Sequence, residues 1–160
     1  DLLWPRRVKD STLTFRELGY PENGVLYDFF SAQIREIGPD DVIELKLKRM
    51  EFKYLIFAPF LKEGLALIGT PEKYVTCSNK LIPKIEIDSS ELRLTVDYSP
   101  DSSLKLLLYS RSAPRDVTLK DTSTTVKWDY NDATQILELT LHFSTIPSND
   151  ISIKFNEEVL

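Results

Sequence analysis

Cysteine, histidine and glycine are scarce in this sequence of 160 residues. Cys77 is the only cysteine, His142 is the only histidine, and the five glycines stand apart from one another. A single cysteine excludes an intrachain disulfide, which suits a reducing compartment, so we expect a cytoplasmic protein. Dispersed glycines exclude the glycine-rich loops that hold nucleotide phosphates, so no nucleotide cofactor is expected.

Long apolar runs and excess positive charge are also lacking. No stretch reaches the roughly 18 uninterrupted apolar residues that indicate a membrane-spanning helix. The net charge is -5, and an acidic surface repels phosphate backbones. The short basic segment Arg6–Lys9 does not reverse that balance. We therefore expect neither a membrane span nor a nucleic-acid partner.

Short segments with a period of two fill most of the chain instead. In Ile43–Lys48 every second residue is Ile or Leu and the others are charged, which is typical of a strand with one wet face. Pro83 makes the segment that contains it an edge candidate. The predicted strands are Val25–Ile37, Ile43–Lys48, Met50–Phe60, Leu65–Ile68, Tyr74–Cys77, Ile82–Ile87, Glu91–Tyr98, Leu104–Tyr109, Val117–Leu119, Thr125–Tyr130, Gln135–Phe143 and Ile151–Phe155. Many short strands joined by polar turns predict an all-β fold, either a β-sandwich or a barrel, and we favour an antiparallel β-sandwich.

The first 24 residues lack the regular strand pattern of the rest of the chain. Leu13–Leu18 fits either a strand or a short helix capped by Ser11 or Thr12, and Gly19–Gly24 is rich in turn residues. The sequence begins without a methionine, and Trp4 would be unusual at a free terminus. We expect a connector at 1–24 that follows another domain of a longer protein, and a β-sandwich domain at 25–160.

His142 and Cys77 are the obvious candidates for catalysis. A Ser-His-Asp site or a histidine metal site would need His142. However, it alternates with Leu141 and Phe143, which places it on the polar face of its predicted strand. A nucleophilic cysteine needs a base that lowers its pKa. We therefore expect a solvent- or domain-facing histidine and a small, semi-buried cysteine, with no catalytic role for either.

Carboxylates are abundant, but their positions favour turns. A glycosidase needs two carboxylates that face one pocket roughly 5–10 Å apart. The close pairs in the sequence are Asp40/Asp41, Glu86/Asp88, Asp97/Asp101 and Asp129/Asp132. They lie at predicted strand ends, where Asp is favoured for its local hydrogen bonds. Asp129–Asp132 lacks the spacing and the glycine of a helix-loop-helix calcium site. No catalytic, substrate-binding or metal site is therefore predicted in this chain.

Aromatic residues offer one further possibility, a platform on which sugar rings stack. Trp4, Trp128 and Tyr130 could form it if they were exposed together. Trp128 alternates with Val126 and Tyr130, a pattern that more often indicates core packing. We favour core packing and keep the platform as the alternative.

The order of segments from Val25 to Phe155 resembles the C-terminal β-domain of glycoside hydrolase family 36. The branch that contains raffinose synthases, seed-imbibition proteins and alkaline α-galactosidases is the most similar. The segments that carry the resemblance are Ile43–Tyr54 (IELKLKRMEFKY), Phe57–Phe60 (FAPF), Leu65–Gly69 (LALIG), Val126–Tyr130 (VKWDY) and Gln135–Leu141 (QILELTL). Upstream, Pro5–Arg7 with Asp10 and Ser11 is similar to the family's segment that links barrel to β-domain.

The resemblance implies a parent enzyme with a catalytic (β/α)8 barrel that acts on α-galactosides through two aspartates. No segment of this sequence matches those barrel motifs, so no catalytic residue is transferred to it. The implied role of this chain is structural: it packs against the catalytic barrel. The galactoside substrate is bound by the parent enzyme. The resemblance leaves open whether the parent enzyme hydrolyses galactosides or transfers galactosyl groups. It also leaves open whether the barrel is on the same polypeptide, and whether the protein forms a homo-oligomer. The alternatives are an autonomous carbohydrate-binding sandwich and a protein-interaction sandwich.

Overall fold

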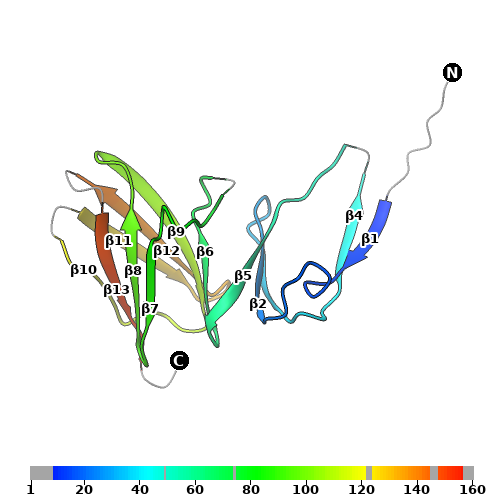
Figure 1. Ribbon diagram of the computed structural model, residues 1–160, viewed down its shortest axis with the longest axis horizontal. Coiled ribbons are helices and arrows are strands. Elements are labelled where there is room, and N and C mark those ends of the chain that lie inside the picture. The colour runs from blue at the N-terminus through cyan, green and yellow to red at the C-terminus, as the bar shows by residue number, and fades with distance from the viewer. Residues whose placement is uncertain (1–8, 49, 74, 122–123, 145–147, 157–160) are drawn as a thin grey trace. The chain divides into compact units, whose positions relative to one another are not determined.

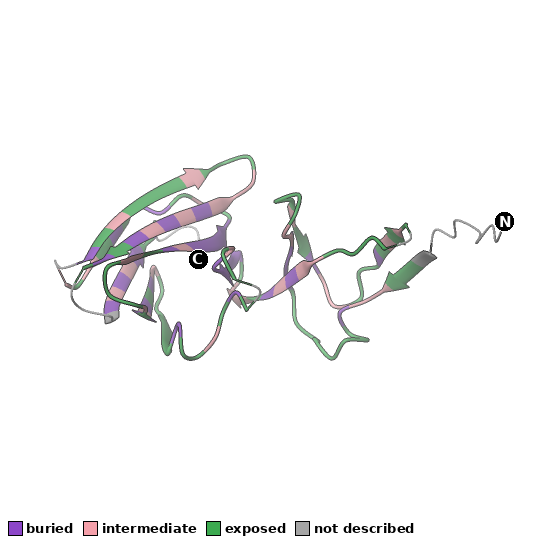
Figure 2. Cartoon of the chain, turned by 90° about the horizontal axis from the view of Figure 1, so that it is seen from above, coloured by how far each residue is buried: buried purple, intermediate pink, exposed green. Residues whose placement is uncertain are grey.

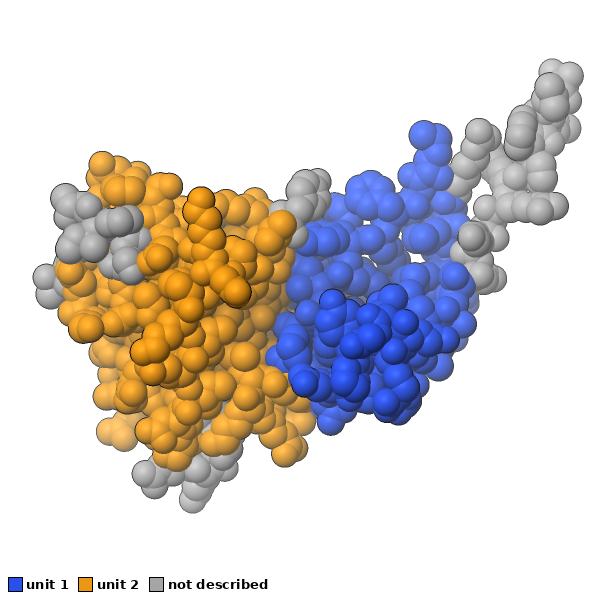
Figure 3. Space-filling model, in the orientation of Figure 1, with its two compact units in different colours: residues 1–59 blue, residues 60–160 orange. Residues whose placement is uncertain are grey.

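A computed structural model describes residues 9–48, 50–73, 75–121, 124–144 and 148–156 (Figure 1). Throughout these ranges the regular elements are β-strands in antiparallel pairs. The all-β, antiparallel sandwich expected from the sequence is confirmed. Within the same ranges, no helix is long and apolar enough to serve as a membrane span. The chain divides into two compact units, residues 1–59 and residues 60–160 (Figure 3).

Unit 1 is built from short strands. Strand β1 (Lys9–Leu13) pairs with β4 (Ile43–Leu47), while β2 (Gly24–Asp28) pairs with β3 (Ile34–Ile37) and with the first residues of β5 (Leu55–Lys62). Its core cluster consists of Phe15, Leu26, Ile37 and Ile43, with Leu13, Leu45, Leu55 and Phe57 packed against it. The rings of Phe15 and Phe57 stack with centroids 4.0 Å apart. The segment predicted as a connector at 1–24 thus includes β1 and the buried Phe15.

Unit 2 holds the sandwich. One of its sheets has the order β11-β12-β9-β6 followed by the end of β5, and the other has the order β10-β13-β8-β7. The strands are β6 (Leu65–Gly69), β7 (Lys84–Ile87), β8 (Glu91–Asp97), β9 (Ser102–Ser110), β10 (Asp116–Leu119), β11 (Thr124–Asn131), β12 (Ile136–Phe143) and β13 (Ser148–Lys154). The predicted edge position of the Pro83 segment is confirmed, because β7 is the last strand of its sheet.

The period of two explains the core of unit 2. Along β8 and β12 buried and more exposed residues alternate, as the burial colours in Figure 2 show for the strands of this unit. Strand β9 is buried on both faces over Leu106–Ser110, as its continuous apolar sequence predicts. The fully buried side chains that fill the space between the sheets are Leu65, Leu92, Leu94, Leu104, Leu106, Leu108, Leu137, Leu139, Leu141, Ile151 and Ile153. Each contributes roughly 1.5–3 kcal/mol by leaving water.

Turns overturn several strand predictions. The single strand predicted at Val25–Ile37 is in fact the two strands β2 and β3, separated by a turn after Asp28. Leu13–Leu18 is neither the strand nor the helix expected, since β1 ends at Leu13 and a turn follows. Met50–Tyr54 lies outside β5, because a turn at Lys48–Glu51 interrupts the apolar run. There the Glu51 carboxylate accepts a hydrogen bond from the Lys48 N–H at 2.8 Å, and Met50 has a φ of 62°.

A further prediction fails at Tyr74–Cys77, of which Tyr74 lies outside the described residues. Residues 75–77 form a loop rather than a strand. Gly69 ends β6 with a φ of +94°, and a Cβ at this position would lie 2.2 Å from the Thr76 carbonyl oxygen. The Thr70 N–H donates to that same oxygen at 2.7 Å. The loop therefore closes directly against Gly69, where only glycine leaves room for it.

Candidate functional site

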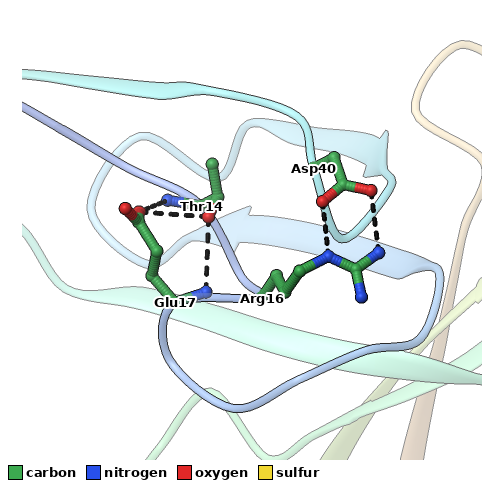
Figure 4. Close-up of polar contacts among 4 residues, drawn as sticks. All are labelled: Thr14, Arg16, Glu17 and Asp40. Carbon is green, nitrogen blue, oxygen red and sulfur yellow. Dashed lines mark hydrogen bonds and ion pairs between the residues drawn. The ribbon is translucent and has the colours of Figure 1, made fainter.

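The predicted carboxylate pair Asp40/Asp41 lies in the turn between β3 and β4. Asp40 receives two hydrogen bonds from Arg16, Nε to Oδ1 at 2.5 Å and Nη2 to Oδ2 at 2.8 Å (Figure 4). Arg16 lowers the pKa of Asp40, chiefly through these hydrogen bonds and also through its charge. Asp41 instead accepts the Gly38 N–H at 2.7 Å and closes its own turn. Both carboxylates therefore hold loops in place rather than face a common pocket.

The turn after β1, which carries Arg16, holds a second local arrangement. Thr14 and Glu17 exchange hydrogen bonds: the Thr14 N–H donates to Glu17 Oε2 at 2.8 Å, and the Glu17 N–H donates to Thr14 Oγ1 at 3.3 Å (Figure 4). The Arg16 N–H donates to the Pro39 carbonyl oxygen at 2.9 Å. Together these bonds fix the turn after β1 on the turn before β4, which presents the Arg16 guanidinium to Asp40.

Of the pairs Glu86/Asp88 and Asp97/Asp101, the first has both carboxylates occupied locally. Glu86 forms an ion pair with Lys84 at 2.9 Å, and Asp88 accepts the Ser89 N–H at 2.7 Å in the turn between β7 and β8. Asp101 adopts a φ of 52° in the turn that leads into β9. These are the roles that the position of Asp in turns predicts.

The segment Asp129–Asp132 is a hairpin end, not a cation loop. The side chain of Asn131 accepts the N–H groups of Ala133 and Thr134 at 3.0 and 3.1 Å. Tyr130 donates its hydroxyl to the Ser110 carbonyl oxygen at 2.9 Å, and burial raises the pKa of Tyr130, with Asp132 adding to the effect. Among the described residues there is no group of three or more His, Cys, Asp or Glu that could hold a metal ion.

His142 is exposed on β12, opposite in face to the buried leucines, as the alternation predicts. Its Nδ1 lies 2.5 Å from the Oγ of Ser103, the residue directly across from it on β9. On the same face Lys105 pairs with Glu138 at 2.8 Å. A Ser–His contact between two exposed strand residues has no described pocket around it to hold a substrate.

Cys77 differs from the semi-buried residue expected, because it is exposed. Neighbouring atoms nevertheless desolvate its thiol and raise its pKa. A raised pKa disfavours the thiolate, which is the nucleophilic form. The geometry therefore gives no support to a nucleophilic role.

Trp128 is 42% exposed, so the core packing favoured from the sequence is wrong for this residue. It lies on the face of β11 that points to the core, between Val126 and Tyr130, which do pack against the core cluster. Trp128 extends beyond that cluster because β11 is the edge of its sheet. Trp4, the third member of the predicted platform, lies outside the described residues.

An exposed aromatic cluster in unit 1 was not predicted from the sequence. It consists of Phe29, Phe30, Phe52 and Tyr54, which we call the aromatic cluster. Phe30 contacts Phe29 and Phe52 edge to face, with ring centroids 5.5 and 5.4 Å apart, and Phe29 contacts Tyr54 at 5.2 Å. Phe30 is 58% and Phe52 68% exposed. The only available signal was the density of aromatic residues in the two segments.

Backbone contacts hold the two segments of the aromatic cluster together. The Asp28 carboxylate accepts the N–H groups of Phe30 and Ser31 at 3.0 and 3.2 Å and orders the turn after β2. The Phe29 N–H donates to the Tyr54 carbonyl oxygen at 3.0 Å. Met50, 93% exposed, lies in the same segment as Phe52. The apolar surface is thus set on an ordered loop pair.

A polar groove of about 320 Å³ lies in unit 2 on the outer face of the sheet β10-β13-β8-β7. Its charged residues already satisfy one another: Asp150 accepts Thr95 Oγ1 at 2.7 Å and Lys120 Nζ at 3.1 Å, and Lys84 pairs with Glu86. Thr95 and then Lys120 lower the pKa of Asp150 through these bonds. Arg93, the remaining charged residue of the lining, pairs with Glu91 outside it. With its charges engaged in this way and no aromatic residue in its lining, the groove selects no evident ligand.

Comparison with models of protein families and with characterised proteins gives no match to this sequence. Among the described residues, two surfaces stand out: the aromatic cluster of unit 1 and the edge strand β11 with its exposed Trp128.

Proposed function

We propose that this chain is a non-catalytic β-sandwich domain of an α-galactosidase-like glycoside hydrolase, and that it packs against the catalytic barrel and stabilises it. The observation that carries the proposal is the aromatic cluster. Phe30 and Phe52 expose more than half of their surface, although aromatic side chains gain most from burial. An ordered, exposed apolar patch of this kind is typical of a surface that another protein domain covers.

The carboxylates support the same proposal. Two acids that served glycoside hydrolysis would share one pocket, one of them with a raised pKa. Instead, Asp40 and Asp150 have pKa values lowered by hydrogen-bonding partners, and the acids of the hairpin turns accept local N–H groups. The identity of the covering domain comes from the resemblance of the strand segments to the β-domain of glycoside hydrolase family 36.

The first experiment concerns the natural protein. We would purify it from its source, measure its intact mass and assay hydrolysis of p-nitrophenyl-α-galactoside. The proposal expects activity at a mass several times the 18.4 kDa of this chain. A protein of 18.4 kDa without activity would overturn it, and activity at 18.4 kDa would place the catalytic acids in this chain.

The second experiment tests the surface itself in that enzyme. The double substitution Phe30→Ser/Phe52→Ser should lower the temperature of half-inactivation, because it removes the apolar contact with the barrel. Val75→Ser is the matched control, since Val75 is also exposed but lies in unit 2. Equal inactivation temperatures for the double variant and the control would contradict the proposed contact.

A second candidate function is an autonomous carbohydrate-binding module, which the exposure of Trp128 favours. Trp128 is 42% exposed, and an exposed indole can stack on a sugar ring. Tyr130 would not contribute, because its hydroxyl is directed to the Ser110 carbonyl. Titration of the chain with galactosides, followed by tryptophan fluorescence, should show a saturable change that Trp128→Ala abolishes. A flat titration would remove this candidate.

A further inference from the structure

Strand β11 is a long, unprotected edge. It forms one end of the larger sheet of unit 2 and is eight residues long. The other outer strands in the described part of the chain, β1, β3, β4, β7 and β10, have four or five residues. Natural proteins usually shorten, bend or charge their edges, because unpaired backbone groups bind further strands. Strand β11 has only one Lys and one Asp as charged residues along its length.

We propose that β11 is a dimer interface, at which it pairs antiparallel with β11 of a second copy of this chain. The two copies would be related by a two-fold axis that passes through the Trp128 pair, perpendicular to the sheet. Such an interface is isologous, so each residue meets the same partner twice. Strand addition at an edge supplies main-chain hydrogen bonds, and the side chains set the register.

The charges on the outward face of β11 select that register. Centring on Trp128 places Lys127 opposite Asp129 of the second copy, and the reverse contact follows by symmetry. Shifting the centre to Lys127 would put two lysines opposite each other, and shifting it to Asp129 would put two aspartates together. Like charges directly opposite destabilise a sheet, whereas opposite charges stabilise it. The sequence of β11 is therefore self-complementary in one register.

The opposite face of β11 fits the same register. There Trp128 would meet Trp128 of the second copy, and Val126 would meet its Tyr130. Aromatic–aromatic and aromatic–β-branched pairs are among the more stabilising cross-strand contacts. Trp128 would lose the exposure that sets it apart from Val126 and Tyr130, both partly buried against the core.

Asp129 gives a further reason for a partner. On β12 the residue directly across from it is Glu138, which is paired with Lys105. Asp129 itself has no ion-pair partner among the described residues, and neither has Lys127. A lysine from the second copy would stand on the open side of Asp129 and offset the repulsion from Glu138.

The test is sedimentation velocity of the 160-residue chain over a wide range of concentration. The wild-type chain should form a dimer in a concentration-dependent manner. Lys127→Glu should raise the dimer dissociation constant at least about tenfold, because symmetry creates two like-charge contacts per dimer. Asp129→Lys should do the same. Lys80→Glu, an equal charge change in an exposed loop of unit 2, should leave the constant unchanged.

A mixture of the two variants tests the register. The Lys127→Glu variant has acidic residues at both 127 and 129, and the Asp129→Lys variant has lysines at both. Each variant should be monomeric alone, yet an equimolar mixture should form a heterodimer, since every cross-strand contact becomes an opposite-charge pair. Circular dichroism spectra like that of the wild type would show that both variants are folded.

Several results would overturn the proposal. A wild-type chain that stays monomeric at all concentrations would leave the edge to a strand of a different protein. If the equimolar mixture of the two variants stays monomeric, the register centred on Trp128 is wrong. If Lys80→Glu weakens the dimer as much as Lys127→Glu does, the effect comes from net charge and not from the proposed contact. Dimerisation that survives Lys127→Glu would place the interface elsewhere. The proposed packing on a catalytic barrel would stand in each case, because it depends on Phe30 and Phe52.

Discussion

In unit 2 the inner strands β8, β9, β12 and β13 run for seven to nine residues, whereas the strands β1 to β4 of unit 1 have four or five. Longer strands bring more inward-facing positions to one core. Unit 2 accordingly fills the space between its sheets with leucines and isoleucines at 0–1% exposure, while the core cluster of unit 1 contains Phe15, Leu26, Ile37 and Ile43. Unit 1 therefore has the smaller buried core of the two units.

The exposed side chains differ in the same direction. Unit 1 leaves Leu18, Tyr20, Phe30, Val42, Met50 and Phe52 exposed, whereas the longer unit 2 leaves Val75, Ile85, Ile87 and Trp128 exposed. The difference teaches that a sandwich can bury more of its own apolar surface, whereas a small sheet with long loops depends more on what it contacts. Unit 1 therefore offers an exposed apolar surface, and unit 2 offers a well-packed core and the edge strand β11.

The largest expected effect is a core truncation in unit 2. Leu139→Ala should lower the free energy of unfolding by about 2–5 kcal/mol, because Leu139 is fully buried and lies directly across from the buried Leu106. Urea unfolding followed by circular dichroism would measure the loss. Phe52→Ala, which removes an exposed ring, should change stability by less than about 0.5 kcal/mol. Similar losses for both would remove the contrast between a packed core and an exposed cluster.

A core truncation in unit 1 should have a smaller effect. Ile43→Ala should cost about 2 kcal/mol, near the low end for buried Ile, because a small core with open sides can collapse around the lost atoms. Hydrogen exchange read by mass spectrometry would show which peptides lose protection. We expect the loss in peptides from residues 9–48 for Ile43→Ala and in those from residues 84–143 for Leu139→Ala. Loss of protection throughout the chain for either variant would mean that the two units unfold as one.

The sequence predicted unit 2 better than unit 1, for a physical reason. In β8 and β12 the strict alternation of Leu with polar residues reports directly which face is buried, and the structure agrees. In Met50–Tyr54 the same alternation occurs without a strand, because the turn at Lys48–Glu51 and the positive φ of Met50 redirect the chain. Local hydrophobicity does not show that a turn will prevail over a strand.

The candidate surfaces divide in a similar way. The turn positions of Asp40, Asp41 and Asp88 were predictable, since Asp bonds to nearby N–H groups wherever a chain reverses. The aromatic cluster was not, because Phe30 and Phe52 come from separate segments and nothing in either segment says that the rings stay uncovered. The exposure of Trp128 was missed because alternation gives the face of a strand but not its place at the edge of a sheet.

The smallest expected effect concerns pH and compares one carboxylate from each unit. Partners lower the pKa of Asp40 in unit 1 and of Asp150 in unit 2. A carboxylate with a lowered folded-state pKa stabilises the protein above its unfolded pKa of about 3.9, and this contribution is lost as the pH falls through the folded-state pKa. The melting temperature should therefore drop as the pH falls from 5 toward 2, a range set by the direction of both shifts.

Substitutions separate the two contributions. Thr95→Val should reduce the acid-induced loss, because Thr95 makes the hydrogen bond that contributes most to the lowered pKa of Asp150. Asp40→Asn should reduce it less, since both Asp40 and Arg16 are largely exposed and water weakens their attraction. Melting curves at several pH values would rank the two variants. A larger effect from Asp40→Asn would show that the turn held by Arg16 matters more than its exposure suggests, and unit 1 would then be ordered by polar contacts rather than by its small core.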